Sequence, residues 1–191
     1  MILEGIVTTL NADGTANISP MGPEVDASMR QMVLKPYRTS TTYHNLKRTG
    51  QGVFHVTDDV ELLAHSAVGT LDPPPELITC RAVDGCILAG ACRWYALRLV
   101  SLDDRQDRTR IVCDVVDQGR LRDFFGFNRA KHAVLEAAIL ATRLNFLNPD
   151  NVLQEFERLR PAVDKTGGSA EQRAFQFLYD FVGAQLAARQ S

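Results

Sequence analysis

The sequence predicts an α+β protein with a β-rich domain over residues 1–120 and a helical extension over residues 121–191. Two hairpin patterns indicate the first domain, because apolar and β-branched runs flank turn residues within 2–19 and again within 92–116. After residue 120 the apolar residues recur at helical spacing. Strands that precede the helices, instead of alternating with them, are typical of the α+β class.

Composition and charge argue against several classes of protein. The chain has 191 residues, of which 45% are hydrophobic and 23% charged, as is ordinary for a soluble, well-packed protein. A formal net charge of −2 without a Lys/Arg run gives no case for a nucleic-acid partner. No apolar run approaches the ~20 residues that span a bilayer. The first ten residues contain Glu4 and no basic segment, so we expect no signal peptide and a cytoplasmic location.

The cysteines and histidines do not suggest a metal site. No two cysteines have CxxC spacing, three of them recur every six residues, and the four histidines are scattered. We therefore predict that the cysteines are small buried apolar residues in a reducing compartment. They are Cys80, Cys86, Cys92 and Cys113.

The first part of the β-rich domain is predicted to contain four strands and one short helix. In chain order these are strands at 2–10, 16–19 and 29–34, a helix at 41–49 and a strand at 52–56. Asn11 to Gly14 supplies the turn of the first hairpin. Pro20, Gly22 and Pro23 should end the second strand, because proline cannot donate to a strand ladder.

The second part is predicted to contain one helix and a second hairpin. Asp58 and Glu61 fit a capping box that opens a helix ending near Gly69. Residues 78–91 are ambiguous. The charged turn at 103–108 separates two runs of strand composition, 92–102 and 109–116.

Three helices are predicted in the extension. The first spans 128–148, and its middle is apolar almost all round, so we expect it to be deeply buried or to lie in an interface. Asn148 caps the second, with Pro149 at its first position, and this helix runs to about residue 160. Ser169 and Gln172 fit a capping box for the third.

A hydroxyl-rich helix start within Lys35–Val56 is the first candidate functional feature. Arg38 precedes four consecutive hydroxyl residues, which are Thr39, Ser40, Thr41 and Thr42. The open N–H groups and the dipole at a helix start favour an anion, and hydroxyls and a guanidinium add donors suited to a phosphate. Taken alone, a capped surface helix explains this stretch as well or better, because Ser and Thr are favoured N-caps.

A hairpin that feeds a Pro/Gly loop is the second candidate feature. It runs from Asp13 to Gly22, and the small residues Ser19 and Gly22 would let a planar ring approach the backbone closely. The simpler alternative is a hairpin followed by a coil. Taken alone, this alternative is preferred.

In this order and at this separation, the two features resemble the FMN-binding split β-barrel, or flavin reductase-like, superfamily. The superfamily's "DG-x-x-N-x-x-P" and "T-x-x-N-[IL]" patterns are matched by Asp13, Gly14, Asn17 and Pro20, and by Thr42, Asn45 and Leu46. A branch of the superfamily, classed as a domain of unknown function, adds a helical C-terminal extension that begins near "N-R-A", here Asn128-Arg129-Ala130. In the superfamily a Gly and a "VNV"-like strand follow, matched here by Gly50 to Val56. Two residues depart from the pattern: His55 stands where asparagine is common in that strand, and the hydroxyl turn begins with Arg38 rather than a bare Ser or Thr.

The resemblance implies an antiparallel Greek-key split β-barrel that binds FMN in a homodimer. The phosphate would lie at the helix start and the flavin ring along the hairpin, with part of the site supplied by the second chain. The implied cofactor-binding residues are Asn17, Ser19, Met21, Gly22, Arg38, Thr39, Ser40, Thr41, Thr42, Asn45 and Arg129. Lys131 is a further cation that could reach the phosphate; for Arg129 and Lys131 a solvated helix start or a salt bridge is an equal alternative.

The implied function is that of a flavin reductase-like oxidoreductase, with a carrier or sensor that does not turn over as the alternative. No catalytic acid or base is identifiable, which agrees with hydride chemistry carried by the flavin itself. Because no GxGxxG follows a predicted strand, NAD(P)H would bind transiently over the flavin face. A structural homodimer that has lost its cofactor is a third hypothesis, and the intact hydroxyl cluster argues against it.

Overall fold

The computed structural model describes residues 1–189 and divides into two compact units. The barrel unit comprises Met1–Thr57 and Pro74–Phe124, and the helical unit comprises Asp58–Pro73 and, among the described residues, 125–189. The helix that follows the fifth strand belongs to the helical unit, although it lies within residues 1–120. The domain boundary at residue 120 stays a prediction.

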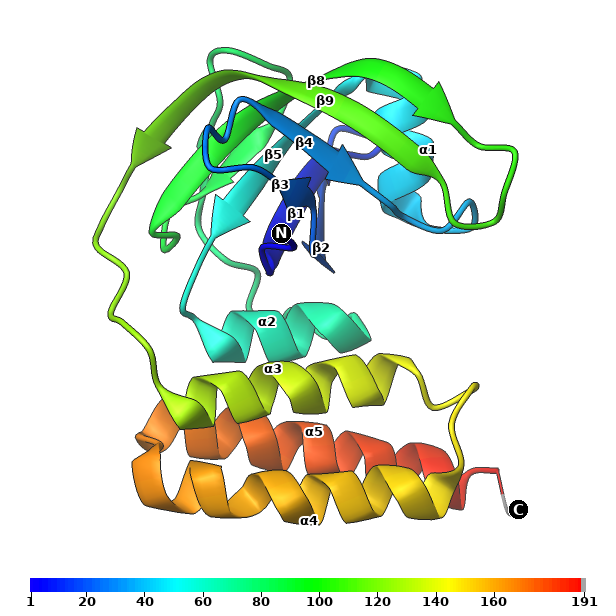
Figure 1. Ribbon diagram of the computed structural model, residues 1–191, viewed down its shortest axis with the longest axis vertical. Coiled ribbons are helices and arrows are strands. Elements are labelled where there is room, and N and C mark those ends of the chain that lie inside the picture. Colours follow the sequence, from blue (N-terminus) through cyan, green and yellow to red (C-terminus); the bar gives the residue numbers. More distant parts are fainter. Residues whose placement is uncertain (190–191) are drawn as a thin grey trace. The chain divides into compact units, whose positions relative to one another are not determined.

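Within residues 1–189, the barrel unit is built on a seven-stranded antiparallel sheet in the order β2-β1-β5-β8-β9-β4-β3, which curls into a half-barrel (Figure 1). The strands are β1 (Gly5–Leu10), β2 (Ala16–Met21), β3 (Glu24–Val25), β4 (Gln31–Leu34), β5 (Gln51–Val56), β8 (Arg93–Asp103) and β9 (Arg110–Arg120). A separate pair, β6 (Leu77–Thr79) and β7 (Cys86–Leu88), occupies the segment whose structure the sequence left ambiguous. The helix α1 (Thr41–Thr49) precedes β5. This arrangement confirms the predicted α+β split barrel.

Both predicted hairpins are present, but the end predicted for the second strand is wrong. β1 pairs with β2 and β8 pairs with β9. β2 continues through Pro20, which lies opposite Ile6, and ends at Met21. β2 is the outermost strand of the sheet, so the missing N–H of Pro20 removes no ladder bond on the open side.

The core of the barrel unit collects apolar side chains from the strands and from α1. Its fully buried members include Val7, Met32, Leu34, Leu46, Phe54, Leu97 and Ile111. Leu46 comes from α1, so the apolar face of this helix packs against the core of the barrel unit. Cys113 joins this core, and Cys80 and Cys92 are buried as well, as predicted from the sequence, whereas Cys86 is only half-buried.

The caps explain where the helices begin. α1 starts and ends as predicted, because Ser40 Oγ accepts the Tyr43 N–H at 3.2 Å and Gly50 adopts φ 68°. In α2 (Val60–Val68) the cap is Asp59, which accepts the Leu62 N–H at 3.0 Å. The predicted capping box of Asp58 and Glu61 is therefore wrong.

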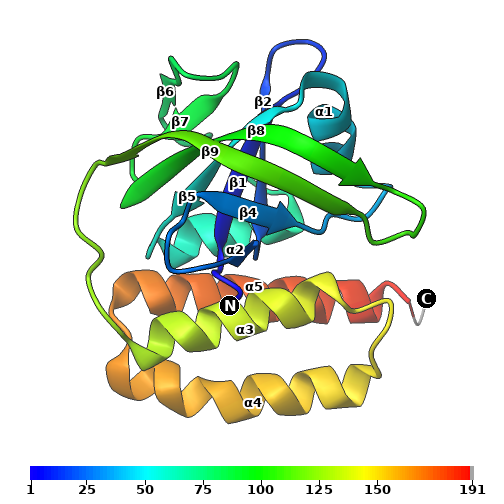
Figure 2. The ribbon, with the colours of Figure 1, turned by 45° about the horizontal axis from the view of Figure 1, so that its top comes forward.

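The helical unit packs α2 with α3 (Arg129–Thr142), α4 (Pro149–Thr166) and α5 (Ser169–Ala187), and the last three run side by side in Figure 2. The apolar middle of α3 is buried, as expected; its buried residues are Ala130, Ala133, Val134, Ala137, Ala138 and Ala141. Three boundaries were predicted wrongly. α3 ends at Thr142 and not at residue 148. α4 does not end near residue 160 but continues through Pro161 to Thr166, with Phe156 and Val163 buried on either side of the proline. The residue that caps α5 is Gly168 and not Ser169. Among the described helices, none is long and apolar enough to cross a bilayer.

Candidate functional site

A largely buried polar network joins α1 to β1 and β2. Asn17 Nδ2 donates to Thr42 Oγ1 at 3.1 Å and to Thr9 Oγ1 at 3.3 Å. Asn45 Nδ2 donates to Thr9 Oγ1 at 3.0 Å and to Asn11 Oδ1 at 2.9 Å. Thr9, Thr42 and Asn45 are buried, so these bonds satisfy polar groups that burial would otherwise leave unpaired. The network fixes the start of α1 on the two strands.

The first turn of α1 leaves two backbone donors open. Ser40 Oγ accepts the Tyr43 N–H, and the Ser40 carbonyl accepts the His44 N–H at 3.2 Å. In the part of the chain that the structure describes, the N–H groups of Thr41 and Thr42 have no acceptor. They lie at the positive end of the helix dipole, where an anion is stabilised.

Three side chains with unused donors accompany these N–H groups. Arg38, Thr39 and Thr41 are exposed, and across residues 1–189 their side chains form no hydrogen bond or ion pair. Arg38 is fixed through its backbone instead, since its N–H donates to the Asp107 carbonyl at 2.8 Å. A guanidinium, two hydroxyls and two open N–H groups form a donor set that fits a phosphate monoester.

A polar clamp ties α1 to the turn between β8 and β9. The Asp104 carboxylate accepts hydrogen bonds from Lys47 Nζ and from the Tyr43 hydroxyl, each at 2.7 Å, and Lys47 also donates to that hydroxyl at 3.0 Å. The hydrogen bonds from Lys47 and Tyr43, with a smaller effect of the Arg38 charge, hold the pKa of Asp104 below its ordinary value. Asp104 therefore stays ionised and keeps the turn beside the helix.

The hairpin residues predicted to contact the flavin ring lie on β2. Asn17, Ser19 and Met21 alternate along this strand, are half-buried and share one face. Because β2 is an edge strand, it presents backbone groups that no neighbouring strand uses. At Gly22 a Cβ would lie 2.7 Å from Ile2 Cγ2 and 2.9 Å from the Glu4 carboxylate, and a contact of Gly22 with a flavin ring stays a prediction. The close approach at Gly22 is thus made by the protein's own first residues.

Ten of the predicted residues belong to the barrel unit, and Arg129 belongs to the helical unit. Arg129 is the first residue of α3; it is exposed, and its side chain has no partner in residues 1–189. Lys131 is engaged elsewhere, because its Nζ donates to Glu171 Oε1 at 2.8 Å and to the Asp58 carbonyl at 2.7 Å. Lys131 therefore stabilises the helical unit, and a role of Arg129 at a phosphate stays a prediction.

His55 departs from the superfamily pattern for a reason of packing. Its ring is fully buried, with Nδ1 3.1 Å from the Ile6 carbonyl and Nε2 accepting the Leu88 N–H at 3.1 Å. Burial lowers its pKa to about 4, although the bond to Ile6 opposes this shift. A neutral His55 with its proton on Nδ1 bridges β1, β5 and the residue that ends β7.

Several residues around the helix start were not predicted from the sequence. Thr9 and Asn11 complete the network, and Tyr43 and Asp104 form the clamp. From the sequence, the charged segment 103–108 could be recognised only as the turn of a hairpin and not as part of the candidate site. Its proximity to α1 depends on the pairing of distant strands, which no local pattern contains.

A hollow of about 370 Å³ lies elsewhere, in the helical unit. It is lined by residues of α4 and α5, namely Arg160, Val163, Asp164, Gln172, Arg173, Phe175 and Gln176. It includes none of the predicted site residues. Arg173 in its wall is already paired with Glu61, at 2.8 and 3.0 Å.

Two solved structures illustrate the fold that this chain shares with known proteins. The FMN-bound protein MM1853 from Methanosarcina mazei matches with a TM-score of 0.78 and 23% identity, over 94% of each chain. The flavoredoxin from Methanosarcina acetivorans matches with a TM-score of 0.54 and 11% identity, over 62% of this chain and 68% of its own.

A third structure, the 2-nitrobenzoate 2-nitroreductase NbaA of Pseudomonas fluorescens, matches with a TM-score of 0.53 and 16% identity, over 61% of this chain and 64% of its own. The likeness to MM1853 extends over nearly the whole chain, whereas the other two cover about the length of the barrel unit.

Family models place the chain more directly. The model described as the N-terminal domain of a protein of unknown function, DUF447, matches residues 3–122. A second model, described as a protein of unknown function, DUF447, matches residues 128–180. Since the two models together account for most of its length, the chain belongs to the DUF447 family.

Proposed function

We propose that the protein is an FMN-binding flavoprotein that holds the cofactor phosphate at the start of α1. The observation that carries this proposal is that the N–H groups of Thr41 and Thr42 have no acceptor within residues 1–189, and that Arg38, three residues before Thr41, forms no side-chain hydrogen bond or ion pair there. Thr39 and Thr41 add hydroxyls at the same turn. Such a donor set is what a phosphate dianion requires, and FMN ends in one. MM1853, which shares the fold over 94% of this chain, is described as FMN-bound.

The flavin ring would lie along β2, next to Asn17, Ser19 and Met21. The unused backbone groups of this edge strand can donate to and accept from the carbonyls and nitrogens of the ring. The Asn17 amide, anchored to Thr9 and Thr42, would keep the strand and the helix start at a fixed separation. A bound flavin would supply the hydride or electron chemistry, and the protein would bind and orient it.

An oxidoreductase of flavin reductase type is the function that this site supports best. NbaA is named as a nitroreductase and the Methanosarcina acetivorans protein as a flavoredoxin, so the fold is used in redox chemistry. A carrier or sensor without turnover is the second candidate, because the donors at the helix start account for flavin binding alone. Reduction of the bound flavin by NADH or NADPH separates the two.

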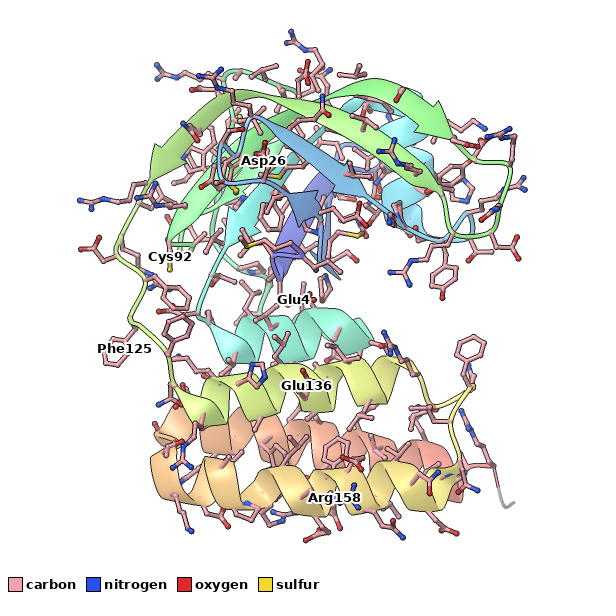
Figure 3. All side chains as sticks on the ribbon, in the orientation of Figure 1. Glu4, Asp26, Cys92, Phe125, Glu136 and Arg158 are labelled. Atoms are coloured by element: carbon pink, nitrogen blue, oxygen red, sulfur yellow. The ribbon has the colours of Figure 1, made fainter. Side chains whose placement is uncertain are left out.

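A second copy of the chain would complete the site. The segment before α3 carries three exposed rings, on Phe124, Phe125 and Phe127, which are 48%, 86% and 109% exposed. In Figure 3 the Phe125 ring points away from the ribbon. Exposed aromatic residues at this density mark an interaction surface. Arg129 follows directly and would reach the phosphate of the partner's cofactor.

The first experiment is a visible spectrum of the purified protein before and after incubation with FMN. Bound oxidised flavin absorbs near ~450 nm and resists removal by gel filtration. A protein that stays colourless after incubation contradicts both the reductase and the carrier hypotheses.

The phosphate assignment is tested by Arg38→Met, which removes the charge from a side chain that forms no hydrogen bond or ion pair in the described chain. One charge-assisted bond is worth about 1.5–3 kcal/mol, so FMN affinity should fall about tenfold or more. Riboflavin, which lacks the phosphate, should bind both proteins equally. Arg30→Met is the matched control, since Arg30 is also an exposed arginine of the barrel unit. Equal losses of FMN and riboflavin would refute the assignment.

A further inference from the structure

Two distant segments are locked together next to the start of α1. The Arg38 N–H donates to the Asp107 carbonyl at 2.8 Å, and the Thr109 N–H donates to the Pro36 carbonyl at 3.0 Å. Thr109 Oγ1 adds a second bond to Pro36 at 2.8 Å, and Thr109 is 1% exposed. The backbone of residues 36–38 is therefore held rigidly by the turn that leads into β9.

This pairing presents an aromatic ring and a cation at the surface. Tyr37 and Arg108 form a β-bridge, and the Arg108 guanidinium carbon lies 5.6 Å from the centre of the Tyr37 ring. Tyr37 nevertheless remains 53% exposed, and Arg108 is exposed as well. Neither the core nor a salt bridge within the described residues accounts for the pair.

The pair adjoins the phosphate donors. The Tyr37 carbonyl accepts the Ser40 N–H at 2.9 Å and Ser40 Oγ at 2.8 Å, so the residue that caps α1 is bonded to Tyr37 itself. Arg38, the exposed cation of the helix start, is the next residue along the chain. Tyr37 and the proposed phosphate donors therefore lie within one short run of the chain, residues 37–42, whereas the clamp is formed by the side chains of Tyr43, Lys47 and Asp104.

We propose that Tyr37 and Arg108 form a second subsite, which takes the adenylate half of a flavin dinucleotide. This inference rests on the proposed function, because it begins where the FMN phosphate would lie. A purine stacks on an aromatic ring and on a guanidinium plane alike, and such stacking does not depend on hydrogen-bond readout. The guanidinium of Arg108 also meets the additional phosphate that FAD carries and FMN lacks. The protein would then bind FAD more tightly than FMN.

Calorimetric titration of the full-length protein with FMN, FAD and riboflavin tests this proposal. Stacking of one base changes affinity by about tenfold or more, so the native protein should prefer FAD over FMN by at least that factor. Tyr37→Ala and Arg108→Met should each abolish most of the preference and leave FMN affinity within about twofold. Tyr37→Phe, which keeps the ring, should retain it.

Arg105→Met is the matched control, because Arg105 is an exposed arginine of the same turn. Its guanidinium is already paired with the Asp103 carboxylate, with Nη2 2.6 Å from Oδ2. FAD binding no tighter than FMN, or variants that weaken both flavins equally, would overturn the subsite while leaving the phosphate site standing. If the native protein binds neither flavin, the phosphate site itself is refuted and the subsite with it. Circular dichroism of each variant verifies that the fold is intact.

Discussion

The buried ring of His55 makes the packing between strands depend on pH, because the ring bridges them only in its neutral form. Its two ring nitrogens are both used, one by the Ile6 carbonyl and the other by the Leu88 N–H. A proton on Nε2 would break the bond to Leu88 and place a charge in the interior. Burial of the ring is the physical reason why its pKa falls from 6.5 to about 4.

The stability of the protein should consequently depend on His55 in the mildly acidic range. The pKa is lower in the native than in the unfolded state, so between pH 4 and 6.5 the native state binds fewer protons and stability rises with pH. Acidification from pH 7 to pH 5 should cost about 2 kcal/mol through this residue. Urea unfolding of the native protein and of His55→Gln at both pH values measures the effect.

The His55→Gln protein should be less stable at pH 7, and its loss between pH 7 and 5 should be smaller by about the same 2 kcal/mol. His44 is exposed and serves as the control, since His44→Gln should keep the native slope. Identical slopes for the native and His55→Gln proteins would contradict the buried, neutral state of the ring.

At the same scale, the candidate site was only partly predictable from the sequence. Arg38 and the hydroxyls follow one another in the chain, so a local pattern was sufficient to single them out. Thr9, Asp104 and Arg108 were not, because strand pairing brings them to α1 or to the residues just before it. The close packing of the N-terminal residues against Gly22 was also not predicted.

At the scale of elements, local sequence predicted those that local chemistry controls. α1 has both its cap at Ser40 and its left-handed stop at Gly50, so its bounds were predicted to the residue. Elements that depend on tertiary context were mispredicted. β2 passes Pro20 because it is an edge strand, and α4 passes Pro161 because buried residues flank it. The two residues of β3 are too short for any periodicity to show.

The junction of α3 and α5 includes an ion pair between the buried Glu171 and the half-buried Lys131 within the helical unit. Glu171 is 7% exposed; one carboxylate oxygen accepts Lys131 Nζ, and the other accepts the Gly168 N–H at 2.8 Å. Burial alone would raise the pKa of Glu171, but the bonds from Lys131 and Gly168 outweigh it and keep the pKa below its ordinary value. The same lysine reaches the residue before α2's cap, through the Asp58 carbonyl.

Removal of one partner should therefore destabilise the helical unit strongly. Lys131→Met leaves the Glu171 carboxylate buried without its cation, which typically costs about 3 kcal/mol or more. Lys131→Met combined with Glu171→Gln should recover part of this loss, because the second change removes the uncompensated charge. Chemical denaturation followed by circular dichroism gives the three free energies of unfolding.

Lys165→Met is the control for this series, since Lys165 is an exposed lysine at the end of α4 and should change stability by no more than about 0.5 kcal/mol. If Lys131→Met is as mild as that control, the pair is not a structural element of the unit.

At the scale of the whole molecule, the exposed phenylalanines are the feature that a single copy leaves unexplained. Phe124, Phe125 and Phe127 lie within four positions of each other and together expose about 500 Å². A stable interface needs about 800 Å² from each partner, so these rings alone would supply more than half of it. Burial of this area in a second copy would also bring Arg129 to that copy.

We expect the protein to sediment with twice the mass of one chain, and Phe125→Ser combined with Phe127→Ser to yield monomers. The double change removes about two phenyl rings of apolar contact, which at roughly 25 cal/mol per Å² is enough to shift the equilibrium by several orders of magnitude. Because the second copy is proposed to complete the cofactor site, FMN affinity should fall together with dimerisation. Phe146→Ser is the control, since Phe146 is 83% exposed in another loop and should affect neither property. A native protein that sediments as a monomer while binding FMN tightly would show that one copy is sufficient for the site, and Arg129 would then have no role at a partner's phosphate.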